Sequence, residues 1–81
     1  MTHLLCEIET TDFAGWKSAF ADEAEARRLA GLTLLQMWRG ADEPARVVCL
    51  FEVADRPRAQ SWLDREAGFG GTFTAHFLKT V

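Results

Sequence analysis

The stretch "LTLLQMWRGADEPARVVCLFEV", residues 32–53, contains two apolar segments joined by a short polar loop. Leu, Val and aromatic residues dominate segments 32–40 and 46–53, which is typical of β-strands. Between them "GADEPA", residues 40–45, contains Gly, Asp and Pro, the residues that favour turns. The stretch therefore predicts two neighbouring strands joined by a turn.

A helix over residues 13–30 is predicted ahead of these strands. Asp12 offers an N-cap and Gly31 a stop signal. Apolar residues recur at helical spacing, at Phe13, Trp16, Phe20 and Ala24. Two ion pairs at helical spacing are expected on the exposed face, Glu23 with Arg27 and Glu25 with Arg28.

A second helix is predicted directly after residue 53. Asp55 serves as its cap, and Pro57 is tolerated in the first turn. Its inward stripe consists of Ala59, Trp62 and Leu63. Gly68 is expected to end it.

Two further strands, residues 3–9 and 72–79, complete the pattern. The order β-α-β-β-α-β is that of an α+β, ferredoxin-like domain covering residues 1–81. This arrangement implies a four-stranded antiparallel sheet with both helices on one face. The expected spatial order of the strands is 4-1-3-2.

Composition and charge exclude several classes of function. Nine basic and 12 acidic residues give a net charge of −3, and no basic cluster is present, so nucleic acid binding and acidic membrane surfaces are not expected. No apolar run reaches the roughly 20 residues of a membrane helix. The start, "MTHLLCEIET", does not resemble a signal peptide. We therefore expect a cytoplasmic protein.

The two cysteines, Cys6 and Cys49, lie within apolar segments far apart in the chain. No CxxC motif is present, so neither a zinc knuckle nor a redox motif is predicted. We expect both thiols to be buried and reduced.

Alternation along the strands divides their side chains between two faces of the sheet. The almost wholly apolar set expected under the helices is Leu4, Cys6, Ile8, Leu35, Met37, Val47, Cys49, Phe51, Phe73, Ala75 and Phe77. The opposite face takes His3, Leu5, Glu7, Leu34, Gln36, Trp38, Val48, Leu50, Glu52, Thr74, His76 and Leu78.

This second face is half apolar and contains no lysine, whereas a solvated face is dominated by polar residues. The chain is small, 48% of it is hydrophobic, and no predicted element remains to cover this face. We therefore expect a homodimer that buries the face. Its apolar contacts are predicted to be Leu5, Leu34, Trp38, Val48 and Leu50.

Three segments carry a resemblance to a known group of proteins. They are "DFAGWKSAF" at 12–20, "RRLAGLTLLQMWRG" at 27–40 and "VVCLFEVADRPRAQSWL" at 47–63. Together they resemble the dimeric α+β barrel superfamily around the antibiotic-biosynthesis monooxygenase-like proteins. The resemblance implies a homodimer and a hydrophobic small-molecule ligand. Known activities in the superfamily include cofactor-free oxygenation, haem degradation, cyclisation and isomerisation.

The sequence also departs from some members of that superfamily. It contains no Asn, so the asparagine of haem-degrading members has no counterpart. It contains no Tyr, so tyrosine-dependent oxygenation has none either. The chain carries no cofactor-binding motif, and no cofactor is predicted.

His76 and Glu7 are the candidate catalytic residues. In the expected strand order His76 lies opposite Leu5 and diagonal to Glu7, a separation of about 7–8 Å. A carboxylate near an imidazole in a half-apolar site suits general acid–base work. A buried hydrogen-bonded pair, or a histidine that only contacts the partner subunit, explains the same pattern. A non-catalytic dimeric scaffold therefore remains the alternative.

The candidate ligand-binding residues surround this pair. They are Gln36 and Leu50 on neighbouring strands, Trp38 as an aromatic wall, and Thr74. Two His and a carboxylate suit iron, which makes His3, Glu7 and His76 candidates for a metal site. His3 and Glu7 are about 13 Å apart along one strand, at roughly 3.3 Å per residue, so no metal site is predicted.

The glycine-rich stretch "GFGGTFTAHF", residues 68–77, raises the question of a phosphate-binding loop. Its glycines do not complete a dinucleotide fingerprint, and the segment leads from a helix into a strand. No Gly-Lys-Ser/Thr follows. We therefore interpret these glycines as a helix end and a connection.

Overall fold

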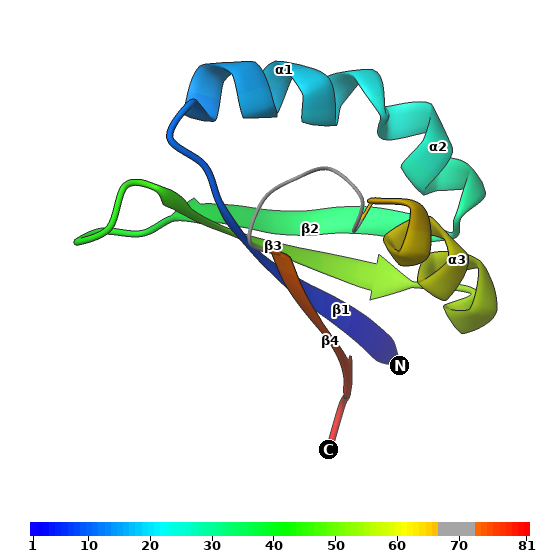
Figure 1. Cartoon of the computed structure of the whole chain (residues 1–81). Helices are drawn as coiled ribbons and strands as arrows, with labels where there is room; N and C mark the ends of the chain where they lie inside the picture. The colour runs from blue at the N-terminus through cyan, green and yellow to red at the C-terminus, as the bar shows by residue number, and fades with distance from the viewer. Residues whose placement is uncertain (67–72) are drawn as a thin grey trace.

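The computed structural model describes residues 1–66 and 73–81, and the side chains of Glu66 and Phe73 lie outside the description. The elements in chain order are β1 (Thr2–Glu9), α1 (Phe13–Asp22), α2 (Ala24–Leu29), β2 (Leu32–Arg39), β3 (Arg46–Val53), α3 (Arg56–Glu66) and β4 (Phe73–Lys79). The strands form one antiparallel sheet in the order β2-β3-β1-β4. All three helices lie on the same side of it (Figure 1). The α+β, ferredoxin-like prediction and the strand order are confirmed.

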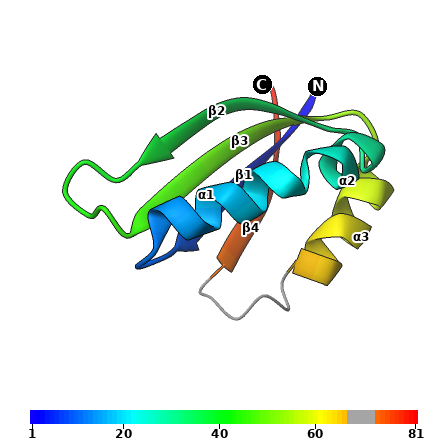
Figure 2. The same cartoon turned by 90° about the horizontal axis from the view of Figure 1, so that it is seen from above.

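The predicted single helix over residues 13–30 is wrong, because the chain bends at Glu23 into α1 and α2. At the bend the Glu23 N–H bonds to the Phe20 carbonyl three residues back. The Arg27 guanidinium donates to the same carbonyl from the side. Competition for one acceptor tightens the last turn of α1. Figure 2 shows α2 turning from the line of α1 toward α3.

Arg27 departs from its predicted exposed position on the helix. It is only 8% exposed, and its guanidinium carbon lies 3.6 Å from the centre of the Phe20 ring. The predicted ion pair of Glu25 with Arg28 forms on the exposed face. The bend at Glu23 therefore turns Arg27 inward, whereas Arg28 stays exposed to water.

The predicted helix boundaries rest on side-chain caps. The Asp12 carboxylate accepts from the Gly15 N–H at 3.0 Å, and the Asp55 carboxylate accepts from the Arg58 N–H at 3.0 Å. Gly31 ends α2 with a φ of 75°, a left-handed conformation that favours glycine. These three predictions are confirmed. The predicted stop at Gly68 lies outside the described residues.

The core lies between the sheet and the helices. Its buried members are Leu4, Cys6, Ala30, Leu32, Val47, Cys49, Phe51, Val53, Ala59, Trp62 and Leu63. The inward stripe predicted for α3 is thus confirmed. The Phe51 ring packs edge-on against Trp62, with ring centres 6.2 Å apart, and joins the sheet to α3.

A β-bulge in β2 corrects part of the predicted division between faces. Leu34 pairs with Phe51 and Gln36 with Leu50, so Leu35 is an extra residue without a partner in the register. Leu34 therefore shares the register of the helix-facing residue Phe51, and its assignment to the opposite face is wrong. Strict alternation fails because one inserted residue reverses the side-chain parity of the preceding strand.

The bulge also brings Leu32 into the core. Leu32 is opposite Val53, and both side chains are buried. Beyond the bulge the predicted parity holds, since Met37 pairs with Cys49 and Trp38 with Val48.

Cys6 and Cys49 are register partners on the helix-facing side, both buried and both free thiols. Burial raises the pKa of Cys6 to about 12, with a smaller contribution from the neighbouring Cys49. Burial also raises the pKa of Cys49 to about 11, against an opposing effect of the Arg27 charge. Both groups are therefore neutral thiols at physiological pH, as buried reduced cysteines should be.

We expect a chromogenic disulfide reagent to leave both thiols unmodified in the native protein at pH 8 and to modify both after denaturation. Because the folded-state pKa values are raised, the neutral thiols stabilise the fold below about pH 8.5. That stability is lost as the pH rises from about 9 toward 12. A Cys6→Ala, Cys49→Ala double variant should show a smaller fall in melting temperature over this range. Rapid modification of either native thiol would contradict the burial.

Candidate functional site on the open sheet face

The open face is the side of the sheet away from the three helices (Figure 1). By register it carries His3, Leu5, Glu7, Glu9, Thr33, Gln36, Trp38, Arg46, Val48, Leu50, Glu52, Thr74, His76 and Leu78. No described helix or loop covers it. All six predicted site residues lie on this face.

The central row of the open face crosses all four strands. His76 lies opposite Leu5, which lies opposite Leu50, which lies opposite Gln36. The predicted neighbourhood of His76 is therefore confirmed residue by residue. It follows from the strand order, because β1 pairs with both β4 and β3.

The adjacent row contains the other candidate residues. Trp38 lies opposite Val48, which lies opposite Glu7, which lies opposite Thr74. This register makes Glu7 a diagonal neighbour of His76, at a separation of about 7–8 Å for such positions. Among the described residues neither side chain makes a hydrogen bond or ion pair. The acid–base assignment of these two residues remains a prediction.

A second carboxylate and imidazole lie closer in register than the predicted pair. His3 is directly opposite Glu52, in a row that continues to Leu78 on β4. Directly opposite positions have Cβ atoms about 4.5–5.5 Å apart. Strand alternation predicts both residues on this face, but the alignment of the first and last strands does not pair them. Aligning residues 3–9 with 46–53 as well would have found the pair.

Histidine, cysteine and acidic side chains do not gather as metal ligands would. Within residues 1–66 and 73–81, no three of them come close enough to hold an ion. His3 and His76 are diagonal neighbours on β1 and β4. Glu7 lies farther along β1 than His3, in the row beyond that of His76. The residues that the register brings together thus form pairs rather than a ligand set.

Large apolar side chains lie exposed on the open face. Trp38 is 47% exposed and Leu78 is 43% exposed. The central residues Leu5, Val48 and Leu50 are half-buried by their neighbours alone. An apolar centre with polar groups around it is the usual anatomy of an interface or a ligand surface.

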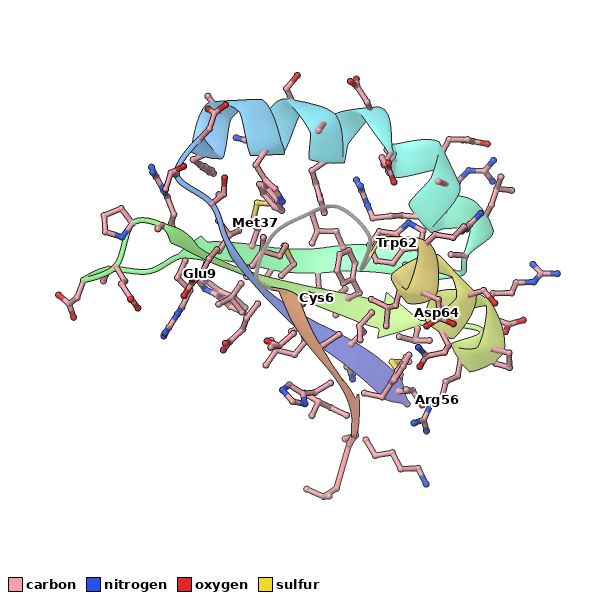
Figure 3. All side chains as sticks on the ribbon, in the orientation of Figure 1. Cys6, Glu9, Met37, Arg56, Trp62 and Asp64 are labelled. Carbon is pink, nitrogen blue, oxygen red and sulfur yellow. The ribbon has the colours of Figure 1, made fainter. Side chains whose placement is uncertain are left out.

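The helix-facing side has an incompletely covered part of its own. Trp16 and Phe20 of α1 stack with ring centres 5.0 Å apart, yet both remain half-buried. Met37 and Phe77 of the sheet are also only partly buried. Figure 3 shows Trp62 and Met37 in the layer between the sheet and the helices. Helix α1 therefore covers the sheet less completely than α3 does.

A buried donor in this layer lacks an acceptor. The indole N–H of Trp62 has no hydrogen-bond partner among the described residues. Leaving a buried donor unpaired costs about 1–3 kcal/mol, so a bound molecule with an acceptor atom would recover a hydrogen bond there. The helical periodicity predicts only that Trp62 belongs to the core. It carries no information about the hydrogen-bond partners of the indole nitrogen.

Comparison with solved structures identifies the fold. A Deinococcus radiodurans protein provisionally assigned as an antibiotic biosynthesis monooxygenase superposes with a TM-score of 0.68 and 11% identity, over 100% of this chain and 93% of the other. A Nitrosomonas europaea protein with the same provisional assignment gives 0.64 and 17% identity, over 100% and 99%. An uncharacterized NIPSNAP domain protein from Burkholderia xenovorans gives 0.65 and 13% identity, over 100% and 95%.

This chain has the antibiotic biosynthesis monooxygenase-like fold. At these identities the likeness concerns the fold alone. The sequence matches no protein-family model, and no curated protein matches it. The resemblance to this superfamily that the three sequence segments suggested is thus supported at the level of structure. In the described part of the chain, no helix has the length and apolar character needed to cross a membrane.

We expect His76→Ala and Glu7→Ala to change the free energy of unfolding by less than about 0.5 kcal/mol, because both side chains are exposed. Leu4→Ala is the matched control within the same strand pair, since it is fully buried and should cost about 2–5 kcal/mol. Urea denaturation measures both effects. A loss above 2 kcal/mol for His76→Ala would make it a structural residue instead of a site residue.

Proposed function

We propose that this protein is a homodimer joined through the open face, and that it binds an apolar small molecule. The observation that carries the proposal is the uncovered apolar centre formed by Leu5, Val48 and Leu50. It continues to exposed Trp38 on one side and Leu78 on the other. At about 25 cal/mol per Å² of apolar surface removed from water, covering such a face is favourable. The monooxygenase-like fold gives further support.

The second copy is the occupant that suits this face. A two-fold contact requires a surface that complements itself, and packed sheets lie about 10 Å apart with interdigitating side chains. The central residues are aliphatic and of moderate size, so two copies can interdigitate across a two-fold axis. The polar residues Gln36, Thr74 and His76 lie on the outer strands, where a rim would be.

The ligand site belongs, in this proposal, to the barrel that the two sheets enclose. Trp38 offers a flat wall, while His76 and Glu7 bring an imidazole and a carboxylate to the same surface. Such groups suit proton transfer in a cofactor-free oxygenation, isomerisation or cyclisation. Gln36 and Thr74 add neutral hydrogen-bonding groups, and Leu50 adds apolar contact. The predicted cytoplasmic location belongs to the same proposal.

A non-catalytic dimer is the second candidate. The specific observation in its favour is that Glu7 and His76 occupy diagonal positions without a hydrogen bond between them. In that case both residues contact only the partner subunit. The helix-facing layer under α1 is then the alternative place for a ligand, because the Trp62 N–H has no acceptor within residues 1–66 and 73–81.

We expect light scattering at micromolar concentration to give the mass of a dimer, and Leu50→Glu to give that of a monomer. A carboxylate at the centre of the apolar row would have to lose its water in the interface. Leu29→Glu is the control, because Leu29 is 61% exposed on α2, on the helix side of the sheet. A monomeric wild type, or a dimeric Leu50→Glu variant, would contradict the interface.

We expect the indole N–H resonance of Trp38 to shift when anilinonaphthalene sulfonate, a probe with an apolar aromatic body and one sulfonate group, is titrated into the protein. The three tryptophans report on different places, because Trp38 lies on the open face whereas Trp16 and Trp62 lie on the helix side. Trp→Phe variants assign the three signals. His76→Ala should weaken the binding of the probe and leave the dimer intact.

The same titration separates the alternatives. Shifts confined to Trp16 and Trp62 would move the ligand site to the layer under α1. If no indole signal shifts at a saturating probe concentration, the small-molecule part of the proposal is wrong.

A further inference from the structure

The open face carries an unbalanced set of ionisable groups. The carboxylates are Glu7, Glu9 and Glu52, the guanidinium is Arg46, and the imidazoles are His3 and His76. With both imidazoles neutral, three negative charges and one positive charge leave the face at −2. Strand β2 contributes no charged group, since Thr33, Gln36 and Trp38 occupy its open-face positions.

The two imidazoles lie among these carboxylates. His3 is directly opposite Glu52 across β1 and β3, and His76 is diagonal to Glu7 across β1 and β4. His3 and His76 are also diagonal to each other, because His3 pairs with Leu78 and Leu5 with His76. Opposite charges at directly facing positions contribute roughly 0.2–1 kcal/mol, and like charges there repel.

Placing two copies face to face doubles this charge in a small space. The two sheets would lie about 10 Å apart, close to the Debye length of about 8 Å at physiological ionic strength, so the repulsion is only partly screened. Protonation of His3 and His76 in both copies would remove the net charge of the six open-face groups named above. The open face is therefore better suited to self-association when its imidazoles are charged.

We propose that His3 and His76 act as a proton-sensitive control of the dimer, which tightens as they become protonated. This inference rests on the proposed dimerisation through the open face. A free imidazole gains its charge as the pH falls through about 6.5. Because the charged form is favoured in the dimer, the added affinity is present where the imidazoles carry their protons and is lost as they release them.

The other charges near the face do not reverse this balance. Arg46 lies at the end of β3, where its guanidinium is 3.0 Å from the Glu43 carboxylate in the adjoining turn. Glu9, the register partner of Arg46, lies at the same end of the sheet. Arg39 pairs in register with Val47 and so belongs to the helix side. The amino group of Met1, next to β1, is a further charge near the face. It is present in every variant compared below, so it does not affect the differences between them.

Sedimentation equilibrium at about pH 7.8 and pH 5.8, at one low ionic strength, tests the proposal. We expect the dimer dissociation constant to fall about tenfold at the lower pH, given pairwise energies of this size. A His3→Gln, His76→Gln double variant should lose this pH dependence. A Glu7→Gln, Glu52→Gln double variant should bind as tightly at pH 7.8 as the wild type does at pH 5.8.

Each outcome separates this inference from the proposed function. A wild-type dimer with equal or weaker affinity at pH 5.8 overturns the proton control and leaves the dimer in place. Undiminished pH dependence in the double histidine variant does the same. A monomer at both pH values, with circular dichroism showing a folded chain, overturns the dimer and this inference with it.

Discussion

The register between β1 and β3, the two central strands, is the constraint on which the rest of the structure depends. It sets Leu4 against Phe51 and Cys6 against Cys49 on the side that the helices cover. Because side chains alternate along a strand, the same register sets Leu5 against Leu50 and His3 against Glu52 on the other side. A slip of one residue would exchange the two faces, exposing the core and burying the carboxylates.

The covered side shows how a short chain completes its core. Helix α3 buries Ala59, Trp62 and Leu63 over the sheet, while α1 leaves Trp16 and Phe20 half-buried. The bend at Glu23 lets α2 approach α3, and the buried Arg27 follows from that bend. In the same layer, the buried indole N–H of Trp62 has no acceptor among the described residues.

The open side combines two properties that have opposite effects on association. Its aliphatic centre favours association, whereas the carboxylates of Glu7 and Glu52 oppose the approach of a second copy. Two histidines on the same face, His3 opposite Glu52 and His76 diagonal to Glu7, can offset the carboxylates by taking up protons. Interface formation, ligand binding and proton uptake would thus share one surface, and the identity of the ligand would be limited by the residues that remain between the two sheets.

The sequence by itself determined the order of elements, both helix caps, the glycine that ends α2 and the neighbours of His76. The elements, the caps and the glycine follow from local spacing, which depends on the chain immediately before and after each residue. The neighbours of His76 follow instead from the expected strand order of the ferredoxin-like fold. Only the tertiary structure decided three other features: the break at Glu23, the bulge at Leu35 and the pairing of His3 with Glu52. The first needs a side chain to reach a distant carbonyl, and the second needs one strand to be fitted against another. The third needs the exact register of β1 on β3, because no local pattern tells which residues of two separate strands will face each other.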